Sequence, residues 1–159
     1  MFHLIPAPLH RLALRLAHGV RRHCWRMFRM RLEGCRVLAL DSAGRVLLVR
    51  HSYGSGAWLL PGGGIARGEA PLAAAQRELA EETGLSLVHA RCLAVIDEPF
   101  YGTVNRVHLV CGEARGDLRC DGREVIAAQF FAAADWPGDL SPRLAAQLDG
   151  WLAPVRAVG

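Results

Sequence analysis

The feature that most restricts how this chain can fold is a glycine-rich turn that leads into a helix. Pro61-Gly62-Gly63-Gly64 stops a short extended segment, and residues 71–83 then show helical periodicity. Pro71 suits the first helical turn, where its missing N–H would have no partner, and Gly84 suits the left-handed position after the last turn. The side expected to pack consists of Leu72, Ala75, Leu79 and Ala80.

One face of this predicted helix is strongly acidic. Glu78, Glu81 and Glu82 stand at positions i, i+3 and i+4, so a helix places their carboxylates side by side. Like charges this close repel each other, and Arg77 alone cannot neutralise three carboxylates. A divalent cation can do so, and Mg²⁺ or Mn²⁺ prefers carboxylate and water oxygens. The alternative is an exposed acidic helix that follows an ordinary turn.

The spacing of these residues resembles a known family signature. Five residues separate Gly63 from Glu69, and seven more lead to Arg77-Glu78-Leu79, then Glu81-Glu82 and Gly84-Leu85. This resembles the complete Nudix box, G-x5-E-x7-R-E-U-x-E-E-x-G-U, where U is apolar. The resemblance implies a Nudix-type α/β/α sandwich with a mixed β-sheet. It also implies a hydrolase that cleaves a diphosphate linkage and requires Mg²⁺ or Mn²⁺.

The resemblance also implies roles for particular residues. The expected metal ligands are Glu78, Glu82, Glu81, Glu69 and the backbone carbonyl of Gly63. Arg77 is expected to hold the carboxylates in place. The proton of the attacking water would pass to Glu81 or to Glu124, which precedes a predicted strand, and the sequence does not choose between them. The catalytic candidates are therefore Glu81, Glu124 and Arg77.

Residues in neighbouring loops are candidates for binding the substrate. Tyr53 and Tyr101 could stack on a base, and Glu98 lies in segment 97–101, which we expect to be a loop able to reach the site. Trp58 occupies the position of a framework aromatic before Pro61. The histidines expected to be structural are His51, His89 and His108.

The remainder of the chain fits a single domain of 34–159, which is long enough for one core. A hairpin is expected from strands 35–40 and 46–50 around the turn 41–44. Further strands are expected at 86–96, 104–111 and 125–131, and an extended piece at 58–60. Ser141 and Pro142 suit the N-cap and first turn of a last helix over 143–152.

Residues 1–33 form a basic leader that predicts an N-terminal amphipathic helix. Segment 1–36 holds eight arginines and one acid, whereas 37–159 holds eleven arginines and fourteen acids. Because the basic charge is confined to the leader, we expect no specific nucleic-acid partner. Three interpretations stay open for the leader: packing on its own domain or on a homodimer partner, weak contact with anionic lipid, or a targeting presequence.

Cysteine usage indicates the compartment. The five cysteines are odd in number and lack CxxC spacing, which argues against a disulfide framework or a zinc site, so we expect a cytoplasmic protein. No apolar run approaches the roughly 20 residues that span a bilayer.

The expected partner is a small-molecule nucleotide, a nucleoside diphosphate linked to another moiety. The first rival is a Nudix module that senses a nucleotide without turnover, although such modules often lose box glutamates. RNA decapping is less favoured, since the sequence shows no second domain for RNA.

Overall fold

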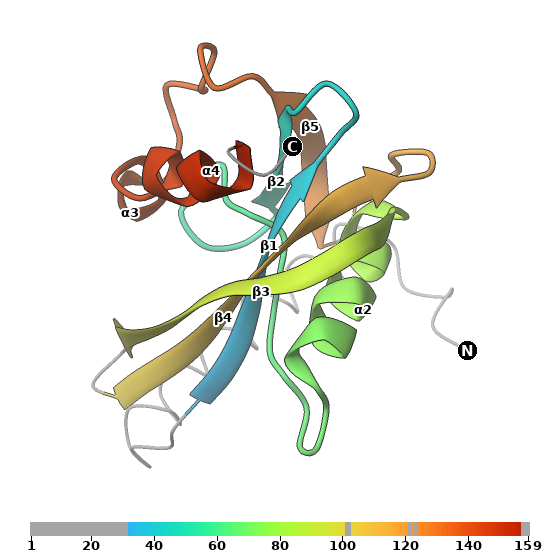
Figure 1. Cartoon of the computed structure of the whole chain (residues 1–159). Helices are drawn as coiled ribbons and strands as arrows, with labels where there is room; N and C mark the ends of the chain where they lie inside the picture. The colour runs from blue at the N-terminus through green and yellow to red at the C-terminus, as the bar shows by residue number, and fades with distance from the viewer. Residues whose placement is uncertain (1–31, 101–102, 121, 123, 157–159) are drawn as a thin grey trace.

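Five strands form one mixed sheet in the order β3-β4-β1-β2-β5 (Figure 1). The computed structural model describes residues 32–100, 103–120, 122 and 124–156. Residues 1–31 of the expected helical leader (1–33) and Tyr101 lie outside these residues, whereas Leu32 and Glu33 of the leader lie in a strand and not in the expected helix. The strands are β1 Leu32–Leu40, β2 Val46–His51, β3 Ser86–Phe100, β4 Thr103–Arg115 and β5 Val125–Phe131. β1 and β4 are parallel and the other neighbours are antiparallel, so the expected mixed sheet is confirmed.

Two of the three inner strands, β1 and β2, are apolar on both faces because both faces are covered. Val37, Leu38 and Ala39 of β1 are fully buried, as are the four residues from Val46 to Val49 of β2. The predicted hairpin is confirmed, with Leu40 opposite Val46. Asp41 stabilises its turn, since its side chain accepts N–H bonds from Ala43 and Arg45.

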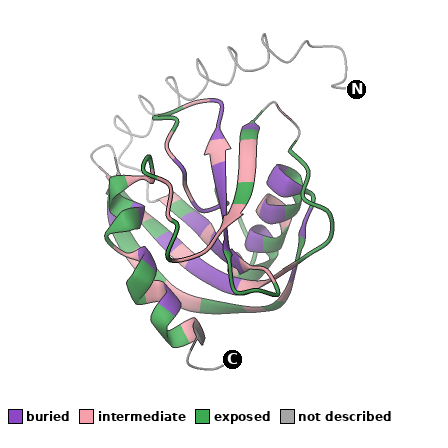
Figure 2. Cartoon of the chain, turned by 90° about the horizontal axis from the view of Figure 1, so that it is seen from above, coloured by how far each residue is buried: buried purple, intermediate pink, exposed green. Residues whose placement is uncertain are grey.

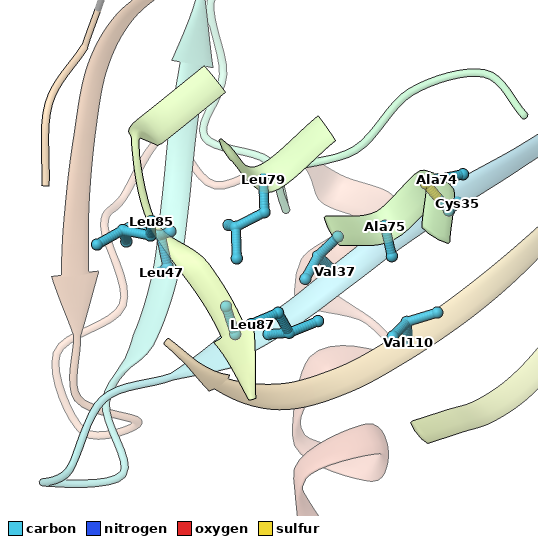
Figure 3. Packing of buried hydrophobic residues seen from close by; sticks show 10 residues of the cluster. Cys35, Val37, Leu47, Ala74, Ala75, Leu79, Leu85, Leu87 and Val110 are labelled. Carbon is cyan, nitrogen blue, oxygen red and sulfur yellow. The ribbon is translucent and has the colours of Figure 1, made fainter. Parts of the chain in front are cut away.

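Helix α2, Pro71–Thr83, covers one face of the sheet and begins and ends where the sequence predicts. Gly84 is left-handed, with φ 71°, and its N–H donates to the carbonyl of Ala80. Ala74, Ala75 and Leu79 pack in one cluster with residues from several strands, among them Val37, Leu47, Leu87 and Val110 (Figure 3). The predicted packing side is wrong in part, because Leu72 is 40% exposed and Ala80 is also exposed. The helix is rotated so that Glu82 and Thr83 are buried instead.

The other face carries two short helices, α3 Pro142–Ala145 and α4 Leu148–Arg156. Leu144, Leu148 and Leu152 pack there in one cluster with Trp58 and sheet residues such as Leu38. The single helix expected over 143–152 is therefore wrong. The chain tightens between the two pieces, where the Gln147 N–H donates to the Leu144 carbonyl. Ser141 precedes α3, but its side chain makes no capping hydrogen bond.

Two strands run further than the sequence indicates. β3 continues to Phe100 and β4 to Arg115, so 97–100 is part of a strand and not the expected loop. Asp97 pairs with Arg106 across the ladder, and the two side chains form an ion pair at 2.9 Å. Pro99 is tolerated because β3 is an edge strand. β1 likewise begins at Leu32 and extends the parallel pairing with β4.

Buried residues gather in the sheet and on the inward sides of the helices (Figure 2). Segment 58–60 adds only isolated bridges, Val49 with Leu59 and Trp58 with Leu140. None of the helices in the described ranges is long and apolar enough to cross a membrane.

Candidate active site

The glycine turn is hydrogen-bonded along β1, which fixes its backbone beside the start of the sheet. The Cys35 N–H donates to the Gly63 carbonyl at 2.9 Å, and the Val37 N–H donates to the Pro61 carbonyl at 2.8 Å. Gly62 has φ 145°, and a Cβ there would overlap the Cys35 carbonyl. A Cβ on Gly63 would lie 2.5 Å from the carboxyl carbon of Glu78. Glycine is therefore required at positions 62 and 63 for this turn to lie between β1 and α2.

Arg77 ties the turn to the acidic helix. Its Nε and Nη2 donate to the two oxygens of Glu69 at 2.8 and 2.9 Å, and its Nη1 donates to Glu78 at 2.7 Å. Nη2 also reaches the Gly64 carbonyl at 3.0 Å, and the Ala66 N–H donates to Glu69 at 2.8 Å. These bonds hold the pKa of Glu69 down at about 2 and raise that of Arg77. Arg77 therefore hydrogen-bonds two of the box carboxylates, those of Glu69 and Glu78.

The three box glutamates of α2 differ sharply in exposure. The side chains of Glu82 and Glu78 are 5% and 16% exposed, whereas that of Glu81 is 62% exposed. Burial raises the pKa of Glu78; Arg77 opposes the rise, and the charges of Glu82 and Glu81 add to it. Glu82 is buried and Glu78 is partly buried, and a cation would stabilise the ionised form of both.

Glu82 is held by residues from two other segments. Its Oε1 lies 2.8 Å from Nε2 of His51, the last residue of β2, and its Oε2 accepts the Gly62 N–H at 3.1 Å. Burial raises its pKa, although His51 and Gly62 lower it, and the charge of Glu124 raises it further. Among the described residues, no group of three or more His, Cys, Asp and Glu side chains is already arranged around one metal position. The carboxylates are instead hydrogen-bonded to Arg77, His51 and Gly62.

Glu124 belongs to the same cluster. The Tyr53 hydroxyl donates to Glu124 Oε1 at 2.8 Å, and the Tyr53 ring lies 5.1 Å from the His51 ring, centroid to centroid. The Ser52 N–H donates to the backbone carbonyl of Glu124, which fixes its segment beside the end of β2. The structure therefore brings Glu124 and Tyr53 to the Glu82 side of the acidic face.

A pocket of about 230 Å³ adjoins the turn on the α3 side of the sheet. It is lined by His51, Gly62, Gly63, Arg36, Asn105 and Arg143 together with apolar side chains. Because His51 and the glycines also contact the acidic helix, the pocket and the carboxylates share a boundary. A molecule that extends from one to the other would cross the glycine turn.

Glu98 forms ion pairs with two arginines that line this pocket, Arg36 and Arg143. Its buried carboxylate accepts both Nη atoms of Arg36 at 2.6 and 2.7 Å and Nη1 of Arg143 at 3.0 Å. Burial raises its pKa, but the two arginines outweigh that effect and leave the pKa below its usual value. The prediction that Glu98 reaches the site from a loop is wrong about the element, since Glu98 lies in β3.

Sequence reasoning missed His51, Arg36 and Arg143. His51 was interpreted as structural, although it directly follows an apolar strand, which is where side chains often leave a sheet to enter a site. Arg36 stands between apolar residues of β1, and that interruption of the pattern was a usable signal. Arg143 carried no comparable signal. Tyr101 lies outside the described residues.

Comparison with known proteins identifies relatives of the whole domain. The family model described as NUDIX domain matches residues 30–155. A Mycobacterium tuberculosis protein, provisionally named 8-oxo-dGTP diphosphatase 2, is 41% identical over 136 residues, which cover 78% of this chain and 82% of that protein. The crystal structure of a MutT NUDIX hydrolase from Burkholderia pseudomallei is 27% identical, has a TM-score of 0.67, and is matched over 76% of this chain and 97% of its own.

A shorter match is to a relative with a different name. An RNA pyrophosphohydrolase of Psychrobacter cryohalolentis is 42% identical over 62 residues, which are 39% of this chain and 35% of that protein. The chain therefore matches about a third of that relative's length.

Proposed function

The chain belongs to the Nudix hydrolase family, and on that premise we propose that it hydrolyses the diphosphate linkage of a nucleoside diphosphate joined to another moiety. The observation that carries this proposal is the buried carboxylate of Glu82 with the partly buried carboxylate of Glu78 beside a glycine turn. Neighbouring anions withdrawn from water in this way are costly unless a cation joins them. A phosphate anhydride brought to the same place would need that cation as well.

The residues present fit a hard divalent cation, Mg²⁺ or Mn²⁺. Their donors are carboxylate oxygens, and the missing Cβ of Gly63 leaves the Glu78 carboxylate in direct contact with backbone. Glu78 and Glu82 would hold the cation, with Glu81 as a more exposed third ligand. When bound, the cation would neutralise charge on the phosphate oxygens and lower the pKa of a water.

Two predicted ligands take different roles in this proposal. Both oxygens of Glu69 already accept hydrogen bonds from Arg77, so Glu69 serves by orienting Arg77. The Gly63 carbonyl accepts the Cys35 N–H, and its second lone pair is the one available to a cation. The turn thus contributes mainly by fixing where the backbone lies.

Glu124 and Glu81 remain the candidates for accepting the proton of the attacking water. Glu124 is supported by its hydrogen bond to Tyr53 and by its electrostatic effect on Glu82. Glu81 is supported by its place on the acidic face, 3.4 Å from Arg77 Nη1. The 2.8 Å hydrogen bond from Tyr53 orients the Glu124 carboxylate more firmly than the 3.4 Å contact with Arg77 orients Glu81, so we favour Glu124.

The pocket beside the glycine turn would hold one of the groups that flank the diphosphate. Arg36 and Arg143, held by Glu98, line it, and Tyr53 stands on the other side of His51. Glu98 then acts on the substrate through the two arginines. The names of the relatives, an 8-oxo-dGTP diphosphatase and an RNA pyrophosphohydrolase, both describe cleavage of nucleotide phosphate anhydrides, which agrees with this substrate class.

A turnover screen tests the proposal. The purified protein would be incubated with Mg²⁺ or Mn²⁺ and with ADP-ribose, dinucleoside polyphosphates, nucleotide sugars, NADH, coenzyme A, nucleoside triphosphates and 5′-triphosphorylated RNA. We expect metal-dependent release of a nucleoside monophosphate from at least one of them, abolished by EDTA and by Glu82→Gln. Binding of a nucleotide without turnover would favour the sensing module, and hydrolysis confined to phosphomonoesters would refute the proposal.

A further inference from the structure

His51 is the residue that connects the pocket, the acidic helix and the Tyr53–Glu124 pair. It ends β2, and the β2–β5 ladder shifts register between Arg50 and His51. Such an irregularity bends a strand and redirects the side chain that follows. Here the imidazole is directed at α2, is only 9% exposed, and contacts Glu82 at 2.8 Å.

The Glu82 carboxylate has one fixed donor on each oxygen. His51 contacts Oε1 and the Gly62 N–H contacts Oε2. An ionised carboxylate, the form that binds a cation, can only accept, so the shared proton belongs to His51 Nε2. The two donors together fix the orientation of the carboxylate plane. Each oxygen keeps a second lone pair for another partner.

His51 also supports the second acidic residue of the cluster. Its ring lies against that of Tyr53 at an interplanar angle of 31°, and the Tyr53 hydroxyl donates to Glu124. An aromatic side chain without an N–H donor would keep this ring contact and lose the bond to Glu82. A side chain with a donor but no ring would keep only the bond to Glu82.

We propose that His51 is a positioning residue, which orients Glu82 for the cation through its Nε2–H and supports Tyr53, and through it Glu124, with its ring. This inference rests on the proposed function. His51 is not itself the ligand, because the nitrogen that faces the site is already hydrogen-bonded to Glu82. Positioning residues of this kind typically change metal affinity by about 10- to 100-fold when removed.

Three substitutions separate the two contributions. His51→Ala removes both, His51→Gln keeps a donor, and His51→Phe keeps a ring. His89→Gln is the matched control, since His89 is an exposed histidine of β3 that lines a different pocket. Folding would be checked by circular dichroism and thermal unfolding. If His51→Ala does not fold, the comparison of His51→Gln with His51→Phe still shows whether the donor is required.

The primary readout is Mn²⁺ affinity without substrate, from the electron paramagnetic resonance signal of the free ion. We expect His51→Ala and His51→Phe to bind Mn²⁺ about 10-fold or more weakly than wild type, and His51→Gln to recover most of the loss. kcat should fall in His51→Gln as well, because Tyr53 and Glu124 lose their support, with a smaller change in KM.

The possible outcomes distinguish a failure of the proposed role of His51 from a failure of the proposed function. Wild-type affinity in His51→Phe, or no recovery in His51→Gln, would overturn the donor role while leaving wild-type turnover intact. An unchanged kcat in His51→Gln would overturn the ring's role. If wild type itself neither binds Mn²⁺ nor shows metal-dependent turnover, the proposed function fails, and the role of His51 fails with it.

Discussion

The carboxylate of Glu78 lies directly against the Cα of Gly63, so that a Cβ there would come within 2.5 to 2.6 Å of all three carboxylate atoms. Gly63→Ala should therefore displace Glu78 and weaken both Mn²⁺ affinity and turnover by about 10-fold or more. Gly64→Ala is the matched control, because a Cβ on Gly64 has no neighbour within 4 Å. Equal loss in both variants would mean that turn flexibility, and not the contact with Glu78, is what matters.

Glu82→Gln should lower kcat by about 10²-fold or more, on the order of 3 kcal/mol of barrier. Glu82 is buried, and its carboxylate lies between His51 and the Gly62 N–H. The amide oxygen can still accept one of these bonds, so the variant should fold with a modest loss of stability. Turnover at saturating Mg²⁺ and circular dichroism check this, and equal turnover by a folded variant would remove Glu82 from the site.

Arg77→Ala should reduce turnover less than Glu82→Gln does. Arg77 is held by Glu69 and orients Glu78, so it acts on the cation only through Glu78. Arg77→Lys should recover little, because one ammonium cannot reproduce the bidentate contact with Glu69. The exposed Arg67 provides the control, since Arg67→Ala should leave kcat/KM unchanged. A loss in Arg77→Ala larger than that in Glu82→Gln would place Arg77 on the substrate.

The choice between Glu124 and Glu81 can be tested by pH profiles of kcat. If Glu124 accepts the proton, Glu124→Gln should remove the acidic limb of the profile, whereas Glu81→Gln should lower the rate and keep that limb. Tyr53→Phe should then resemble a mild form of Glu124→Gln, because it deletes the hydroxyl that holds this carboxylate. The reverse pattern would assign the role to Glu81.

The ion triad of Glu98, Arg36 and Arg143 should make folding sensitive to acid. The folded state holds the Glu98 pKa below its ordinary value of 4.5, because Arg36 and Arg143 stabilise the ionised carboxylate. The triad's contribution is therefore present above pH 4.5 and lost as the pH falls through the lower folded pKa. The free energy of unfolding of Glu98→Gln should fall less steeply than that of wild type below pH 4.5. Parallel slopes in urea titrations would contradict this.

The leader can be tested separately from the domain. Deleting residues 1–31 should leave turnover of the best substrate intact. If the leader contacts anionic lipid, the full chain should co-sediment with anionic vesicles at low salt and be released as salt rises. A homodimer would be favoured instead if the full chain does not bind vesicles and if deletion of residues 1–31 changes the molecular mass measured by sedimentation.

The acidic helix is the part of the site that local sequence determines. Glu78 and Glu82 share a face because a helix has 3.6 residues per turn, and Pro71 and Gly84 bound that helix for equally local reasons. The same local reasoning predicted the central hairpin, whereas the mixed sheet was implied by the family resemblance. It could not predict how α2 is rotated, which depends on packing against β1 and β2, so Leu72 was wrongly assigned to the buried side.

Tertiary structure decides which residues surround that helix. His51 reaches Glu82 across 31 residues of sequence, and Glu98 reaches Arg36 across 62 and Arg143 across 45. These contacts depend on strand order, on the irregular register at the end of β2 and on the continuation of β3 past its expected end. None of these is a local property, because each follows from how the strands pair. The sequence by itself therefore determined the carboxylates, and the packed sheet determined the donors that orient them.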